Sequence, residues 1–364
     1  MIVAFIKGVQ FMKYPKLIYW ALFVVLIFSG TLIAQNSPNR VGTTASNFLE
    51  LGYDPKGLAM GDASVSTVDD LSSIYWNPAG LAFLGKNEVY FTYQPWLVDT
   101  KTYLASVGIV VPQIGTFAAS VLGINYGEME VTTMELQEGT GERYSPSDLA
   151  VNLSYGRSLT SWFGFGGTIK YVNSSIFHCN ASAVAADFGV IIKTGYFSPG
   201  EKRDGMKIGM SLSNYGTRMR YSGLDMLRSI DIAPDEAGNY KDVKVEYKTD
   251  SWELPLIFRI GVSVNPVVTT YHRLTLAVDA LHANNNNETV NLGAEYTFNI
   301  PGVTKLFLRG GYRSLFLEES EFGPTFGAGV LLQAIHGQAI QIDYAYRSIG
   351  ILGNINAMGI SFTF

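Results

Sequence analysis

Charged residues are scarce in this sequence: Asp, Glu, Lys and Arg together make up 16% of the 364 residues, against roughly 25% in ordinary soluble proteins. Cysteine is nearly absent. The chain contains 1 cysteine, Cys179, which excludes an internal disulfide framework and a zinc site built from several cysteines. The net charge is −5, and no basic cluster interleaved with aromatic residues occurs, so we expect no nucleic-acid partner. What the chain has instead is 13% aromatic residues and 38 glycines.

Long hydrophobic runs are also lacking, except near the N-terminus. There, three lysines precede the apolar run Leu17–Ile27, and the small residues of "SGTLIAQ" follow. This order is typical of a secretory signal peptide with cleavage after Ala34. The alternative, a transmembrane anchor, needs about 20 apolar residues, whereas the core of this run has roughly a dozen. We assign residues 1–34 to a signal peptide and leave open whether translation starts at Met1 or Met12.

From about residue 87 onward, the sequence alternates between apolar and polar residues. In "TVNLGAEYTF", Val290 and Leu292 share one face with Tyr296, while Asn291 and Glu295 lie on the other. Strict alternation predicts a strand with one apolar and one polar face. Many of these runs are long for a soluble strand, but they have the length needed to cross a bilayer at a tilt.

The alternating runs number about fourteen, and they lie near 87–97, 102–111, 115–126, 148–158, 162–177, 183–196, 206–215, 253–265, 271–283, 289–298, 304–314, 323–333, 338–347 and 355–364.

The connections between these runs alternate as well. Short turns such as "PQIG" and "AIHG" lie on one side, whereas two connections on the other side, 127–147 and 216–252, are long. This asymmetry is the pattern of an outer-membrane barrel. The predicted fold is all-β: a transmembrane antiparallel β-barrel of about 14 strands in residues 87–364, preceded by an N-terminal hatch or plug in residues 35–86. An even number of strands predicts that both termini lie in the periplasm.

The sequence ends on an alternating strand, "NAMGISFTF", in which Ile360, Phe362 and Phe364 share one face. A terminal aromatic residue on such a strand is similar to the assembly signal of outer-membrane barrels. We therefore expect outer-membrane lipid and the barrel-assembly machinery as partners.

The faces of the barrel follow from the cost of burying charge. A charged side chain on the lipid face costs about 2–4 kcal/mol at the bilayer midplane, so the apolar set faces outward and the polar set faces the lumen. Because the lumen set contains both signs, we interpret it as a network of internal ion pairs rather than an ion-selective ring. Its main members are Arg259, Asp279, Glu295, Arg309, Arg313, Asp343 and Arg347.

Residues 42–84 break the alternation. "TTASNFLELG" resembles a short helix with Thr43 or Thr44 as N-cap and Gly52 as its stop. Further on, "LSSIYWNPAGLAFL" contains Asn77 before Pro78, which disfavours a helix at Asn77 and allows a new turn to start at Pro78. An irregular backbone is not tolerated in contact with lipid, so we predict that this segment plugs the barrel.

The stretch "GLAMGDASVSTVDDLSSIYWNPAGLA" resembles the N-terminal segment of the PorV/PorQ family of outer-membrane proteins, which is similar in turn to the FadL-type transporters. The upstream "GTTASNFLELG" is similar to the opening of the same family. The residues that carry this resemblance, which we call the hatch motif, are Gly57, Gly61, Asp69, Asp70, Trp76, Asn77, Pro78, Ala79 and Gly80.

The resemblance implies a non-enzymatic role in type IX protein secretion, with the secretion translocon or the signal domains of exported cargo as partners. It also implies an alternative, the transport of long-chain fatty acids or other hydrophobic small molecules, for which the apolar hatch could form a binding pocket. The Met-containing loop 216–252 is a candidate protein-binding surface, or a segment that folds back over the barrel mouth.

The sequence gives little support for catalysis. A hydrolase would need a serine, a histidine and an orienting acid within reach of one another. The chain has 4 histidines, and the serine pair at 174–175 lacks the G-x-S-x-G context. No two histidines have metal-ligand spacing. We predict no catalytic residue, no metal site and no cofactor.

Overall fold

The structure is a computed structural model that describes residues 40–364, apart from residues 202–203, 239–241, 318–319 and 335–336. The signal peptide predicted in residues 1–34 and the choice between Met1 and Met12 lie outside the described residues.

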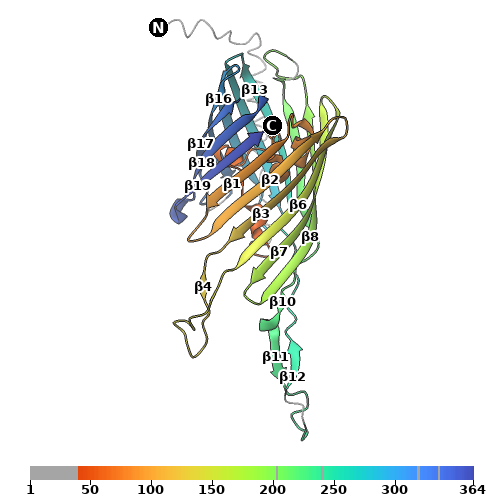
Figure 1. The fold of residues 1–364 in the computed structure, drawn as a ribbon, viewed down its shortest axis with the longest axis vertical. Coiled ribbons are helices and arrows are strands. Elements are labelled where there is room, and N and C mark those ends of the chain that lie inside the picture. Colours follow the sequence, from red (N-terminus) through yellow and green to blue (C-terminus); the bar gives the residue numbers. More distant parts are fainter. Residues whose placement is uncertain (1–39, 202–203, 239–241, 318–319, 335–336) are drawn as a thin grey trace. The chain divides into compact units, whose positions relative to one another are not determined.

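In the described chain, fourteen antiparallel strands form a closed barrel (Figure 1). The ring closes because the first strand pairs with the last, with Glu88 opposite Thr363, and because β8 pairs with β9. The structure therefore confirms the predicted fold class. The barrel strands are β1 (Glu88–Pro95), β2 (Lys101–Val111), β3 (Gly115–Asn125), β6 (Ser147–Thr160), β7 (Phe163–Ile176), β8 (Cys179–Lys193), β9 (Lys207–Gly216), β13 (Ile257–Val268), β14 (His272–Ala283), β15 (Thr289–Ile300), β16 (Thr304–Leu315), β17 (Pro324–Gln333), β18 (Ala339–Ser348) and β19 (Asn354–Thr363).

The two predicted long loops extend well beyond the barrel (Figure 1). The β3–β6 connection carries a small hairpin. The β9–β13 connection carries a longer hairpin, and a separate short strand that precedes this hairpin pairs with the start of β8. We call the end of the barrel that bears these loops the long-loop rim, and the opposite end the short-turn rim. The loop elements are β4 (Met129–Glu130), β5 (Arg143–Tyr144), β10 (Ser222–Gly223), η4 (Leu224–Met226), β11 (Leu227–Ile230) and β12 (Val243–Glu246), and a 3₁₀ turn η6 (Gly350–Leu352) precedes β19.

Two strands, β8 and β13, begin several residues away from the positions that the alternation predicted. Strand β8 begins at Cys179 instead of residue 183, because its first residues pair with β7 and with β10. Strand β13 begins at Ile257 instead of residue 253. The residues before it, Trp252 and Glu253, form isolated bridges with Met219 and Thr44 instead of joining the barrel.

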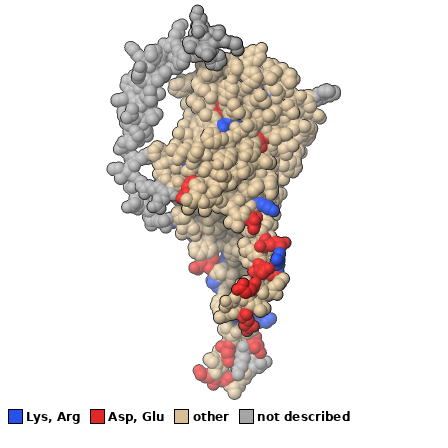
Figure 2. All heavy atoms as spheres, turned by 90° about the vertical axis from the view of Figure 1, so that its left-hand side faces the viewer, with Lys and Arg blue, Asp and Glu red and all other residues tan. Residues whose placement is uncertain are grey.

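The outer surface of the barrel is apolar, and the inner surface is largely polar or small. In β1, Phe91 and Tyr93 are 51% and 48% exposed, whereas Tyr90 and Thr92, which alternate with them, are 1% and 6% exposed. Charged side chains gather over the extended loops and are sparse over the barrel wall on the face drawn in Figure 2. Among the described helices, none has the length and apolar character that crossing a membrane requires.

Residues 42–84, called the hatch below, lie within the ring of strands. The hatch contains four short helices, η1 (Asn47–Glu50), α3 (Pro55–Ala59), α4 (Ser73–Trp76) and η2 (Pro78–Phe83). Helix α3 contacts β16 to β19, whereas η2 contacts β3, β6, β7 and β8. The hatch therefore touches opposite walls of the barrel through different helices.

The hatch runs from one rim of the barrel to the other. At its start, Arg40 forms an ion pair with Glu253 at 3.7 Å and Ala45 donates a hydrogen bond to the Glu253 carbonyl, which places this end at the long-loop rim. At its end the chain enters β1 at Glu88, at the short-turn rim beside Thr363. The even strand number thus fixes the two ends of the barrel on one rim but does not fix the beginning of the hatch.

The helix expected from "TTASNFLELG" is only a single 3₁₀ turn, η1. Ser46, in a left-handed conformation, occupies the N-cap position without a capping hydrogen bond, and Thr44 instead donates to the Asn47 side chain at 2.6 Å. The expected Thr43 or Thr44 cap is therefore wrong. The short apolar stretch is held by packing, since Phe48 and Leu49 are 2% and 3% exposed.

Candidate functional site

The first turn of helix α3 in the hatch is organised around Asp54. Asp54 is the N-cap of α3, and its carboxylate accepts from the backbone of Lys56 and of Gly57 at 3.2 and 2.8 Å, while Pro55 occupies the first turn. The same carboxylate accepts from the indole of Trp76 at 3.3 Å and from the hydroxyl of Tyr90 at 2.5 Å. Asp54 thus connects two parts of the hatch to the inner face of β1.

Lys56, at the start of α3, is held among carboxylates. Its ammonium forms an ion pair with Asp70 of the hatch and lies 4.0 Å from Asp343 of β18. Burial acts to lower the pKa of Lys56, but the carboxylates, Asp70 first, outweigh burial and raise it. Lys56 is therefore a fixed positive charge between the hatch and the wall.

Asp343 also belongs to an ion-pair network of the wall. Arg309 on β16 donates to Glu295 on β15 at 2.6 Å and to Asp343 on β18 at 2.7 Å. Since Lys56 approaches Asp343 from the hatch side, this network continues from the barrel wall into the plug.

A second ionic contact joins the middle of the hatch to the same wall. Asp62 accepts from Arg313 at 3.1 Å and from Arg347. Next to it, Gly61 has a φ of +62°, and its amide donates to the Thr325 hydroxyl at 3.0 Å. Thr325 in turn donates to the Ala59 carbonyl at 3.0 Å, so one threonine on β17 fixes the turn that follows α3.

Two further inward charges also contact the hatch. Asp279 on β14 accepts from the Val65 amide at 2.8 Å. Arg259 on β13 donates to Ser213 at 3.0 Å, and its guanidinium lies 5.7 and 5.9 Å from the ring centres of Tyr75 and Trp76. These distances fit cation–π contacts.

The Asn77-Pro78 turn fastens the hatch to the other wall. Asn77 is extended, with a φ of −162°, and its side chain accepts from the Ala79 amide at 3.1 Å, so it caps η2. The same side chain donates to the carbonyls of Val65 at 2.9 Å and of Val190 on β8 at 3.1 Å. Gly80 lies within η2 and is needed for space rather than for a chain reversal, because a Cβ there would lie 2.5 Å from Ser73 Cβ.

Glycines on the inner face of the barrel form a socket for the hatch backbone. An added Cβ at Gly166 would lie 2.2 Å from the Pro78 carbonyl oxygen, and one at Gly311 would lie 2.3 Å from the Gly61 amide nitrogen. Contacts under 3.0 Å with a hatch residue occur for Gly108, Gly156, Gly164, Gly166, Gly189, Gly209, Gly293, Gly311 and Gly327. The glycines allow the strands to approach the plug at backbone distance on both walls.

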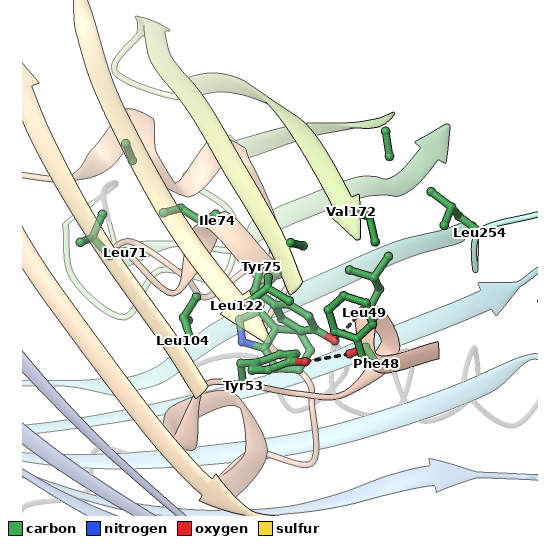
Figure 3. Close-up of a cluster of buried hydrophobic side chains, with 14 of the residues drawn as sticks. Phe48, Leu49, Tyr53, Leu71, Ile74, Tyr75, Leu104, Leu122, Val172 and Leu254 are labelled. Carbon is green, nitrogen blue, oxygen red and sulfur yellow. Dashed lines mark hydrogen bonds between the residues drawn. The ribbon is translucent and has the colours of Figure 1, made fainter. Parts of the chain in front are cut away.

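An apolar cluster fills the space between these anchors (Figure 3). The rings of Tyr53 and Tyr75 meet edge to face at 5.6 Å, and Tyr75 meets Trp76 in the same way at 4.8 Å. The Tyr53 hydroxyl donates to the Phe48 carbonyl at 3.1 Å. Trp76 itself is 2% exposed, so the aromatic residues of the hatch are packed into the barrel.

Two cavities accompany this arrangement. One, of about 60 Å³, lies between the hatch and β13 to β16 and includes Asp62, Trp76, Arg259 and Arg313 in its lining. The other, of about 510 Å³, lies among the long loops and includes Tyr144, Phe177, Asp225 and Trp252. Among the described residues, no group of three or more His, Cys, Asp or Glu side chains is placed to hold a metal ion.

The structure brings some of the predicted site residues together and separates others. In the hatch motif, Gly57 lies against the Trp76 ring and Ala79 is fully buried. Asp69, in contrast, has a side chain that is 62% exposed and lies 4.0 Å from Lys207. In the lumen set, only Glu295, Arg309 and Asp343 pair with one another, because the others contact the hatch. At the C-terminus, Ile360, Phe362 and Phe364 are exposed on the outer face.

Sequence reasoning missed Asp54, Lys56, Asp62 and Tyr90. The pair Asp54-Pro55 is a recognisable helix-start signal, an N-cap followed by proline at the first position, and could have been found. Asp62 carried no local signal, because its partner Arg347 lies 285 residues further along the chain.

The closed apolar-walled barrel and its internal plug define the chain as a hatch-bearing outer-membrane β-barrel. Two solved structures with this fold are the toluene transporters TodX of Pseudomonas putida (TM-score 0.52) and TbuX of Ralstonia pickettii (TM-score 0.50). Each is 11% identical to this chain, and each comparison covers 85% of this chain and 97% of the other. Residues 34–229, more than half of the chain, match the family model of the type IX secretion system protein PorV. The chain belongs to the PorV family. No curated protein matches it.

Proposed function

We propose that this protein is a non-enzymatic component of protein export at the outer membrane, where it binds exported proteins or the secretion translocon. The observation that carries the proposal is the match of residues 34–229 with a type IX secretion family. The matched range includes the whole hatch and the first long loop, and it ends within the second.

The fit of the hatch supports a barrel that stays closed. Ion pairs from Lys56 and Asp62 reach the β16–β18 wall, while η2 lies at backbone distance from β6 to β8. The cavity beside the hatch holds about 60 Å³, whereas pockets for drug-sized ligands hold roughly 300–1,000 Å³. Of the two cavities described, the one among the long loops is the larger.

We also propose an orientation for the barrel. In the proposed arrangement the short-turn rim, with Glu88 and Thr363, faces the periplasm, and the long loops face the outside. Phe364 and its neighbours on the outer face are the proposed contact for the barrel-assembly machinery.

A second candidate is the transport of hydrophobic molecules. It is favoured by the shared fold of the two toluene transporters and by the apolar character of the hatch, in which Phe48, Tyr53 and Trp76 are buried. This function requires the hatch to move, because the cavity next to it is small in the structure.

Affinity purification of the tagged full chain from outer membranes separates the two candidates. For export, we expect translocon subunits or exported proteins to copurify, and loop deletions that leave the barrel folded to abolish the copurification. A barrel deleted in the η6 turn serves as the control, since that turn lies outside the two long loops. Recovery of a hydrophobic molecule bound inside the barrel, with no protein partner, would contradict the export proposal.

A further inference from the structure

The cavity of about 510 Å³ is built from three separate segments at the long-loop rim. The β4–β5 hairpin contributes Tyr144, the β7–β8 turn contributes Phe177, and the β9–β13 loop contributes Tyr221 and Trp252. The Tyr144 and Phe177 rings lie 5.3 Å apart, Asp225 contacts His178 of the β7–β8 turn, and a backbone bridge between Met219 and Trp252 joins the two ends of the β9–β13 loop. Each of the three segments therefore contributes at least one aromatic ring to the wall, and contacts between the segments hold the wall together.

The charge of this cavity has one sign. Its lining includes three carboxylates, Glu130, Asp225 and Asp250, and none of its described lining residues is Lys or Arg. Glu130 pairs with Arg143 at 3.3 Å, and Asp225 contacts His178 at 3.0 Å. Asp250 is exposed and has no ion-pair partner among the described residues.

Aromatic faces and carboxylates attract the same kind of group. The face of an aromatic ring is negative and binds a cation within about 6 Å, and the carboxylates add a favourable field. The volume of the cavity is also much larger than that of an ammonium group, and Ile176 and Met226 form an apolar part of its wall. A side chain with a long aliphatic stem and a positively charged end fits this combination. Its stem can pack against the apolar wall while its charged group stays near the carboxylates.

We propose that this pocket binds a lysine or arginine side chain, together with a neighbouring apolar residue, presented by an exported protein. The inference rests on the proposed export function, because only that function makes an exported protein the source of the bound side chain. The pocket then works as a selective contact on the outer side of the barrel and leaves the hatch in place.

The test uses the full-length protein in detergent micelles and three fluorescent pentapeptides. The central residue of the peptide is lysine, norleucine or glutamate, and in all three it stands between a tyrosine and a valine. Anisotropy titrations should give the tightest binding for the lysine peptide, about tenfold tighter than for the glutamate peptide. The difference should shrink at higher salt, because the groups are partly exposed.

Matched variants assign the effect to the pocket. Asp250→Asn should weaken the lysine peptide about two- to fivefold, as expected for an exposed charge contact, and Asp225→Asn combined with it should weaken binding further. The control, Glu246→Gln on β12, removes the same charge from the same loop outside the pocket and should leave the affinity unchanged. Heat-modifiable migration on a gel checks that each barrel is folded.

Equal binding of the three peptides, or equal effects of Asp250→Asn and Glu246→Gln, would overturn the proposal. Binding of n-butylammonium as tight as that of the lysine peptide would overturn it as well, because the occupant would then be a small cation. These outcomes are distinct from failure of the export proposal. That failure would appear as a lack of copurifying protein even though the pocket prefers the lysine peptide.

Discussion

At the scale of single residues, the hatch depends on a few buried polar side chains with several partners each. Asp54 accepts hydrogen bonds from Lys56, Gly57, Trp76 and Tyr90. Removing such an acceptor leaves buried donors unsatisfied, which costs about 1–3 kcal/mol for each group. Asp69, fifteen residues further on in the same segment, has a mostly exposed side chain and no comparable set of contacts.

Asp54→Ala should therefore loosen the start of α3. We expect a loss of about 2–4 kcal/mol, from the lost cap and the unsatisfied Trp76 and Tyr90 donors. Hydrogen exchange of the amides in residues 55–61, measured in micelles, should become at least about thirtyfold faster. Asp69→Ala is the control and should leave these rates unchanged; similar acceleration in both variants would contradict the role of Asp54.

Asp62 offers a second test at this scale. Its carboxylate faces two arginines, and Arg347 is almost completely buried. Asp62→Asn should leave these cations without their counter-charge, and breaking a buried ion pair in this way costs about 3–5 kcal/mol. We expect the hatch to unfold at a lower denaturant concentration, as measured by the change in Trp76 fluorescence. An unchanged midpoint would mean that water or another acid compensates the charge.

At the scale of elements, glycines on the strands let the hatch backbone pack directly against the strand backbone, because glycine has no side chain. Gly311 on β16 lies against the Gly61 amide nitrogen, whereas its neighbour Gly310 has no atom closer than 3.8 Å to an added Cβ. Glycine normally weakens a strand, so a glycine at such a position indicates that another backbone needs the space. The inner face that the alternation predicts to be polar thus also carries glycines, and these make room for the hatch backbone.

Gly311→Ala should displace the turn at Gly61, because the added Cβ would collide with backbone rather than with a movable side chain. Gly310→Ala adds the same methyl group one residue away and should be tolerated. Limited proteolysis of the folded barrels should show faster cleavage within the hatch for Gly311→Ala only. If both variants resist the protease equally, the socket is less tight than the structure indicates.

At the scale of the whole molecule, the wall, the lumen and the long loops of the barrel have different roles. The wall faces lipid with apolar side chains, the lumen holds the hatch through ionic and backbone contacts, and the long loops carry the larger cavity. The proposed export function places the binding surface outside the barrel, so the barrel itself must remain impermeable.

Trp76→Ala should open a path through the plug. Trp76 is buried between Tyr75, Gly57 and Arg259, and its loss removes packing worth about 3–5 kcal/mol. In planar bilayers we expect a higher conductance for small ions than in the unchanged protein. Trp162→Ala, in the exposed turn between β6 and β7, is the control; equal conductance in all three proteins would argue against a sealing role for Trp76.

The sequence alone determined the barrel, because a strand with one face in lipid must alternate, and fourteen such runs carry the pattern with clear turns between them. It also indicated a plug, because "YWNPAG" cannot form a lipid-facing strand. The tertiary structure decided how the plug is held. Asp62 and Arg347, or Gly311 and Gly61, are far apart in the chain, and no local pattern encodes such a pair. The loop cavity was likewise decided only by folding, since its aromatic and acidic residues come from three segments that meet at one rim.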